Sequence, residues 1–115
     1  MYFKFGVDSF IWAEKFSEKD LWIIPKAKEL GFEVIDFAIA DPFSFPVKAV
    51  KEKLEEVGID CVCTTTLTAE TNPISPDPEV RKNAAEAMKK CVDICEELES
   101  PILGGVNYAA WGYLT

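Results

Sequence analysis

The chain has 115 residues, of which 49% are hydrophobic and 28% charged, and its formal net charge is −8. The acidic balance argues against a nucleic-acid partner, because affinity for nucleic acid comes from basic contacts to phosphate. The absence of histidine excludes a His-based acid–base pair, a catalytic triad and a His-rich metal site within these residues. No apolar run is long enough to span a membrane and no signal peptide is visible, so we expect a single cytoplasmic domain over residues 1–115.

The first strand is expected over residues 3–8, and an aromatic loop follows it. Ser17 and Asp20 have the spacing of a capping box, so a helix is expected to begin there and to end at Gly31. Pro25 lies inside this predicted helix, and we expect it to kink the helix.

The second strand is expected over residues 34–38, with a loop over 40–44 after it. The following segment has an apolar stripe at helical spacing and ends at Gly58, where a glycine is typical of a helix C-terminus. It therefore predicts a second helix, whose stripe consists of Val47, Val50, Leu54 and Val57.

The third unit is the most informative stretch of the chain. Residues 61–65 predict a strand, and a loop rich in Thr, Asn and Pro follows it. This long loop leaves the carboxyl end of a strand, where α/β folds place their sites. A long helix is expected next, and its apolar face consists of Val80, Ala84, Ala87, Met88, Cys91, Cys95 and Leu98. A fourth strand over 101–105 and an aromatic loop over 106–115 complete the order.

Alternation of strands and helices predicts an α/β fold with a parallel sheet. Two architectures fit: a flavodoxin-like open sheet, and the first half of a (β/α)₈ TIM barrel. The chain stops just after a strand, without a helix to cover it, which favours the interrupted barrel. A half barrel requires the strand order 1-2-3-4 with all helices on one face, whereas a flavodoxin-like sheet reverses direction and carries helices on both faces.

The four cysteines raise the question of a zinc site. Cys61 and Cys63 share the parity of Thr65 and are expected to point into the barrel. Cys91 and Cys95 lie on the helix face that packs against the other side of the sheet. We therefore expect free core thiols, with neither a zinc site nor a disulfide linking the two pairs.

Two carboxylates, Asp8 and Asp36, lie within predicted strands of a parallel sheet, where the surroundings are normally apolar. A buried carboxylate needs a partner or a raised pKa. Asp8 is close to the carboxyl end of its strand, and both a site role and a structural role remain open for it. For Asp36 we favour a structural role, paired inside the barrel.

Four motifs occur in order along the chain: KFGVDSFIWAE, KELGFEVIDF, LTAETNPISPDPEVRKNA and PILGGVNYAAWG. Together they resemble the D-tagatose/D-psicose 3-epimerase family of sugar isomerases, which has the xylose-isomerase-like TIM barrel. The resemblance covers essentially the whole chain, and SPDPEVR is its most specific piece. It implies that this chain is the N-terminal half of such a barrel.

The resemblance also implies where a sugar would bind. The family's sugar-contacting positions in this half fall on Asp8, Phe16, Thr65, Val106 and Trp111. Phe16 and Trp111 would be stacking surfaces, and Asp8 and Thr65 would contact hydroxyl groups. Asp8 replaces an aromatic residue and Thr65 a small residue or Cys, so these departures bear on the choice of sugar.

By resemblance, the reaction is metal-dependent epimerisation of a ketose at C3 through an enediolate. A divalent metal, Mn²⁺ or alternatively Mg²⁺ or Co²⁺, is expected in the intact enzyme, with its ligands on strands five to eight. No catalytic residue and no metal ligand is therefore expected in these 115 residues, and this fragment alone should be inactive.

The expected partners are a small ketose and further copies of the same chain, and neither nucleic acid nor membrane. Two other readings remain. One is a non-catalytic half barrel that self-associates. The other is an endonuclease-IV-like member of the same superfamily, which would need several His ligands and a basic surface, and the sequence has neither.

Overall fold

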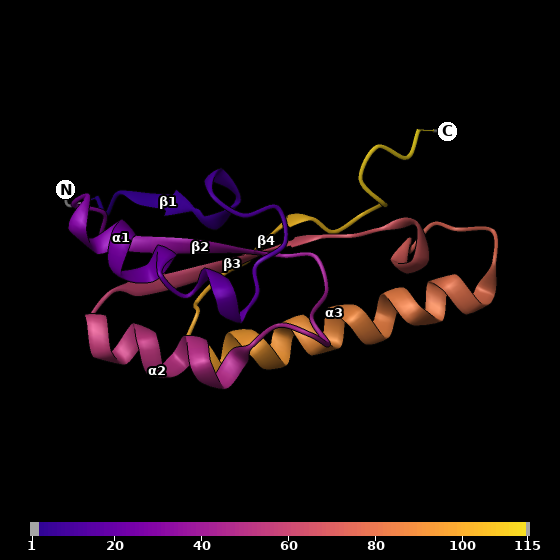
Figure 1. Ribbon diagram of the computed structural model, residues 1–115. Helices are drawn as coiled ribbons and strands as arrows, with labels where there is room; N and C mark the ends of the chain where they lie inside the picture. The colour runs from indigo at the N-terminus through magenta and orange to yellow at the C-terminus, as the bar shows by residue number, and fades with distance from the viewer. Residues whose placement is uncertain (1–2, 115) are drawn as a thin grey trace.

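Four parallel strands form one sheet in the computed structural model, which describes residues 3–114 (Figure 1). The strands are β1 (Gly6–Asp8), β2 (Val34–Ile39), β3 (Asp60–Thr66) and β4 (Leu103–Val106), and they pair in the order β1-β2-β3-β4. The helices that connect them are α1 (Ile23–Glu29), α2 (Val47–Val57) and α3 (Pro78–Leu98). The predicted parallel α/β sheet and its strand order are confirmed.

All three helices pack against one face of the sheet. On β2, Ile35 and Phe37 are fully buried, and the register places them beside Cys61 and Cys63 of β3. These four side chains belong to a single core cluster that also contains buried residues of α1, α2 and α3. Because successive side chains of a strand alternate between faces, the residues between them form the opposite face, which the α-helices leave open (Figure 1).

The ends of α2 and α3 follow from local sequence. Gly58 adopts φ 75° after α2, and its amide donates to the carbonyl oxygen of Leu54 at 2.8 Å, which is the conformation that glycine adopts most easily. At the start of α3, the Asp77 carboxylate accepts a hydrogen bond from the amide of Glu79 at 2.9 Å. Pro78 occupies the first helical position, where a missing N–H costs nothing.

The first predicted helix is divided in two. A short 3₁₀ helix, η2 (Glu18–Asp20), precedes α1, and the capping box forms as expected, with the amide of Ser17 donating to Asp20 Oδ2 at 2.9 Å. Pro25 is the third residue of α1. The amides of a helix's first turn have no intrahelical acceptor, so Pro25 interrupts no hydrogen bond there. Pro25 therefore lies in the first turn of α1 rather than inside the longer helix that was predicted.

Candidate functional site

The larger of two cavities lies at the carboxyl ends of the strands. Its volume is about 920 Å³, and its floor consists of open-face residues: Asp8 at the end of β1, Ala38 of β2, and Thr64 and Thr66 of β3. Small side chains at these positions leave the space that bulkier ones would fill. Ligands of α/β folds bind beyond the carboxyl ends of the strands, so we take this cavity as the candidate site.

Loops that follow the strands build the walls of this cavity. Phe10 and Ile11 come from the loop after β1, and Trp111 from the segment after β4. The amide of Trp111 donates to the carbonyl oxygen of Leu67 at 2.9 Å, which ties the last segment to the loop after β3. Trp111 is nevertheless 74% exposed, so most of its indole surface is available to a ligand.

The charged residues that line the cavity are both acidic, Asp8 and Glu14. Asp8 Oδ1 accepts a hydrogen bond from the amide of Phe10 at 2.7 Å, which orients the carboxylate. The neighbouring strand places Asp36 directly beside Asp8 in the sheet register. Burial, and secondarily the charge of Asp8, raise the pKa of Asp36 to about 6. Asp36 Oδ1 is buried and has no hydrogen-bond partner among the described residues.

Three of the five predicted sugar-contacting residues lie on the open side of the sheet. Asp8 and Trp111 line the cavity, and Val106 is aligned in the register with Thr66, one of the lining residues. The structure thus brings these three positions to one end of the sheet, although they come from opposite ends of the chain.

The other two predicted residues lie on the helix side. Phe16 is 5% exposed and packs with its ring centroid 5.1 Å from that of Phe37, in the core behind the sheet. Thr65 is 3% exposed and aligned with buried Ile39, and its hydroxyl donates to Asn107 Oδ1. The structure does not bring either side chain into the cavity, and a direct contact with sugar stays a prediction for both.

The expected orientation of the β3 cysteines is wrong. Cys61 and Cys63 face the helices, in the same core cluster as Cys91 and Cys95 of α3. The Cys61 thiol lies 3.7 Å from the carbonyl oxygen of Leu98, near the end of α3. All four thiols are free and buried. The prediction took Thr65 to face the barrel interior and gave the two cysteines the same orientation. Thr65 faces the helices as well, so all three side chains were assigned to the wrong face of the sheet.

Sequence reasoning missed Ala38, Thr64 and Thr66 as lining residues. A usable signal was present in β2, where Asp36 alternates with Ile35 and Phe37. A carboxylate does not face an apolar helix layer without a partner, so Asp36 marks the parity of the open face. The register then extends that face to the even-numbered residues of β3.

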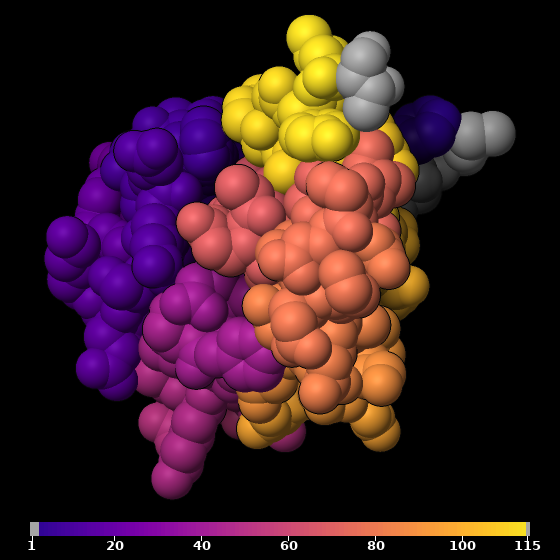
Figure 2. Space-filling view, turned by 90° about the vertical axis from the view of Figure 1, so that its right-hand side faces the viewer, coloured from indigo at the N-terminus to yellow at the C-terminus, as the bar shows by residue number. Residues whose placement is uncertain are grey.

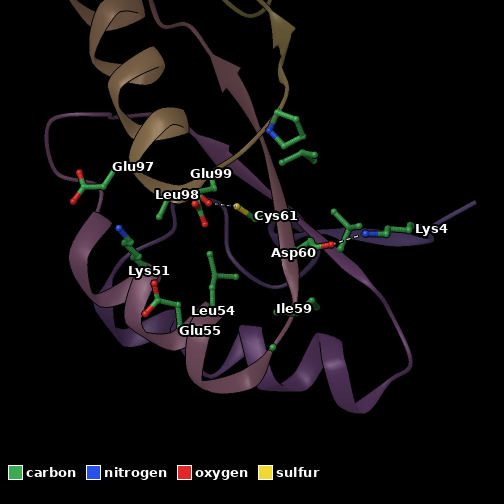
Figure 3. Close-up of a pocket in the computed structure, with 14 residues that line it drawn as sticks. Lys4, Lys51, Leu54, Glu55, Ile59, Asp60, Cys61, Glu97, Leu98 and Glu99 are labelled. Carbon is green, nitrogen blue, oxygen red and sulfur yellow. Dashed lines mark hydrogen bonds and ion pairs between the residues drawn. The ribbon is translucent and has the colours of Figure 1, made fainter.

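A second cavity, of about 530 Å³, lies at the opposite end of the sheet (Figure 3). Leu54 and Leu98, near the ends of α2 and α3, line it together with Cys61, and the Lys4–Asp60 ion pair of 2.6 Å lies at one side. No residue predicted to bind sugar lies there. This end of the sheet contributes to packing rather than to the candidate site.

The structure offers no metal centre within residues 3–114, where no group of three or more His, Cys, Asp or Glu side chains is placed to hold an ion. The divalent metal that the resemblance implies therefore does not fit the side chains of this part of the chain. In the same residues, no helix is long and apolar enough to cross a membrane.

Comparison with known proteins places this geometry in context. The family model described as "Xylose isomerase-like TIM barrel" matches residues 24–112. A ketose 3-epimerase of Arthrobacter globiformis is 32% identical over 108 residues, covering 93% of this chain and 37% of that protein. An L-ribulose 3-epimerase of Methylomonas sp. (strain DH-1) is 27% identical, covering 95% of this chain and 38% of the relative.

Solved structures agree with the sequence comparison. A D-allulose 3-epimerase from Methylomonas sp. superposes with a TM-score of 0.87 at 28% identity, covering 93% of this chain and 38% of that one. The curated relatives are matched over only 37 to 39% of their own length. The four-stranded sheet is thus the counterpart of the first half of a TIM barrel, as predicted.

Proposed function

Because the chain belongs to the xylose isomerase-like TIM barrel family, we propose that it is the first half of a ketose 3-epimerase. The observation that carries this proposal is the cavity at the carboxyl ends of the strands, with Asp8 at its floor and Trp111 in its wall. Barrels of this kind place their active sites at this end of the sheet. Two of the relatives are named as a ketose 3-epimerase and an L-ribulose 3-epimerase, and these names support the same reaction class.

The lining residues suit an uncharged sugar. Thr64 and Thr66 offer hydroxyl groups, and the Asp8 carboxylate can accept a hydrogen bond from a sugar hydroxyl. No Lys or Arg lines the cavity in the described chain, and the two ionisable residues that do are Asp8 and Glu14. A phosphate group would meet negative charge there without a compensating cation. We therefore propose a free ketose as the substrate.

We propose direct sugar contacts for Asp8, Val106 and Trp111, and supporting roles for Phe16 and Thr65. The exposed indole of Trp111 can pack against the C–H face of a sugar, as aromatic faces do with apolar surfaces. Phe16 holds the loop after β1 by its packing in the core. Thr65 holds the segment after β4 through its hydrogen bond to Asn107.

Epimerisation at C3 removes a proton next to the ketose carbonyl and returns it to the other face, through an enediolate. A divalent metal, for which Mn²⁺ is our first choice, would belong to a part of the full-length enzyme beyond these residues, because the described residues do not fit one. The side chains of this half bind and orient the sugar and exclude water. This chain alone is therefore expected to bind a ketose weakly and not to epimerise it.

A ligand titration tests the proposed site. We expect D-psicose, added to the ¹⁵N-labelled chain at millimolar concentration, to shift the indole resonance of Trp111 and the amides of Thr64 and Thr66. A phosphorylated ketose should cause smaller shifts. In Trp111→Ala, the shifts should weaken at least severalfold, because the stacking surface is lost.

Trp22→Ala is the matched control. Trp22 is 50% exposed and packs against Trp12 on the helix side, away from the cavity, so its loss should leave the titration unchanged. Shifts that follow Trp22, or that survive in Trp111→Ala, would refute the site. In a full-length enzyme containing this sequence, Trp111→Ala should lower kcat/KM for the ketose about tenfold while the Tm moves by less than about 2 °C.

A further inference from the structure

Asn72, in the loop after β3, is a buried polar residue that the cavity does not use. It is 3% exposed and is not among the residues that line the cavity. Burying an amide group without hydrogen bonds costs free energy, so its partners indicate what the side chain does. Asn72 Oδ1 accepts hydrogen bonds from the amides of Ile74 and Ala110, each at 3.2 Å. The side chain therefore joins the loop after β3 to the segment after β4.

Two consecutive amides of the segment after β4 are held by the loop after β3. The amide of Ala110 donates to Asn72 Oδ1, and the next amide, that of Trp111, donates to the carbonyl oxygen of Leu67 at 2.9 Å. Leu67 and Asn72 lie on either side of the 3₁₀ helix η3 (Ala69–Thr71). Figure 2 shows the yellow segment after β4 lying against the salmon-coloured loop after β3. The backbone that carries the Trp111 indole is therefore fixed by two hydrogen bonds, and the acceptor of one is a side chain.

The loop around Asn72 is held by its own hydrogen bonds. The amide of Thr68 donates to Thr71 Oγ1 at 2.9 Å, and the amide of Thr71 donates to the carbonyl oxygen of Thr68 at 3.0 Å. On the other side, the amide of Ser75 donates to the carbonyl oxygen of Asn72 at 3.1 Å. Asn72 is thus a fixed support, and a side chain that is itself held can hold a neighbouring segment in place.

Packing contributes little to holding the segment that carries Trp111. Ala109 and Ala110 are buried, but a methyl side chain removes only a small apolar area from water. The Trp111 indole lines the cavity and does not belong to the core cluster. The position of the indole therefore depends strongly on the two hydrogen bonds. Of their two acceptors, only that of Asn72 can be removed by a substitution.

We propose that Asn72 is a positioning residue for the Trp111 indole, and that it thereby sets the affinity of the cavity for a ketose. It acts through the backbone of Ala110 and does not touch the sugar. Asparagine suits this role because a neutral amide oxygen accepts from two backbone amides without the cost of a buried charge. The statement about ketose affinity rests on the proposed function, whereas the placement of Trp111 does not.

Hydrogen exchange, measured by mass spectrometry on a full-length enzyme that contains this sequence, tests the placement without any ligand. Asn72→Ala, and separately Asn72→Leu, should speed exchange in peptides from residues 106–114 at least fivefold, because an anchor of this segment is lost. Asn72→Asp keeps the acceptor oxygens and should restore most of the protection. Two variants without the acceptor keep the test valid if one of them fails to fold.

Asp20→Ala is the matched control for this measurement. Asp20 is 8% exposed, and its carboxylate accepts a hydrogen bond from the amide of Ser17 at 2.9 Å, before α1. Its loss removes a buried acceptor outside the contact with the segment after β4, so exchange in residues 106–114 should stay unchanged. Unchanged exchange in the Asn72 variants, or an equal increase in Asp20→Ala, would overturn the proposal.

Steady-state kinetics of the same enzyme with D-psicose test the effect on affinity. Asn72→Ala should raise KM about fivefold and change kcat by less than about twofold, and Asn72→Asp should restore KM. In Trp111→Ala, adding Asn72→Ala should raise KM by less than about twofold, because the group that Asn72 positions is already absent. Additive effects, or a lower kcat at constant KM, would overturn the assignment. If the parent enzyme does not turn over a ketose, the proposed function fails, and the exchange rates alone decide whether Asn72 positions Trp111.

Discussion

Replacing Asp36 by the isosteric Asn should stabilise the protein near neutral pH. Burial first, and the Asp8 charge second, raise the pKa of Asp36 from its ordinary value of 3.8 to about 6. The native state therefore binds this proton more tightly than the unfolded chain does. The contribution of Asp36 to stability is greatest below pH 3.8, falls as the pH rises to about 6, and stays at its minimum above that.

The size of the effect follows from the two pKa values. The difference between them corresponds to about 3 kcal/mol of unfolding free energy for a fully buried group. We expect roughly 1–2 kcal/mol, because solvent still reaches part of the Asp36 side chain. Asp36→Asn removes the charge at every pH. The variant should therefore exceed the parent in unfolding free energy by this amount at pH 7.5, and the gain should largely disappear at pH 4.5.

Urea unfolding followed by tryptophan fluorescence, at one fixed chain concentration, measures both free energies. Asp41→Asn is the control, because hydrogen bonds from Ser44 and from the amide of Phe43 lower the pKa of Asp41. That variant should lose stability similarly at pH 4.5 and 7.5, since Asp41 is largely ionised at both. If Asp36→Asn raises the unfolding free energy equally at both pH values, ionisation of Asp36 does not destabilise the folded state and the argument is refuted.

Four further substitutions probe the fold, each by urea or thermal unfolding. Phe37→Ala should cost about 3–5 kcal/mol, because this fully buried ring would leave a cavity in the core; a loss below about 1 kcal/mol would contradict its central packing. Gly105→Ala should cost about 1–3 kcal/mol, since Gly105 has φ 101° and a Cβ there would lie 2.5 Å from the Thr65 carbonyl oxygen. Gly104→Ala, where the Cβ would meet only ordinary contacts, should cost less, and equal losses would exclude the steric explanation. Asp77→Ala should cost about 1 kcal/mol by removing the cap of α3, and an unchanged Tm would show that the cap contributes nothing.

The elements that sequence predicted well are those whose pattern is local. The stripe of α2 and its end at Gly58 follow from helical spacing and one left-handed position, and the structure confirms both. The strand order follows from the alternation of strands and helices together with the handedness of crossovers. None of these features requires knowledge of what a given side chain touches.

Which side chains of a strand face the helices could be predicted less well. In β3 both parities carry small residues of similar polarity, so the sequence of that strand alone does not show which set faces the helices. Because Thr65 was assigned to the barrel interior, Cys61 and Cys63, which share its side of the strand, were assigned to the wrong face as well. The first helix also begins later than predicted, at Ile23 rather than after the capping box, so that Pro25 lies in its first turn.

Three of the four thiols between β3 and α3, those of Cys63, Cys91 and Cys95, have a kinetic consequence. Burial raises the pKa of Cys91 to about 12 and of Cys95 to about 11, while hydrogen bonding with Cys61 and burial raise that of Cys63. Because the thiolate is the reactive form, a labelling reagent can modify Cys63, Cys91 and Cys95 only after α3 separates from the sheet. The rate at which these three thiols take up such a reagent therefore measures how often this helix opens, without any introduced probe.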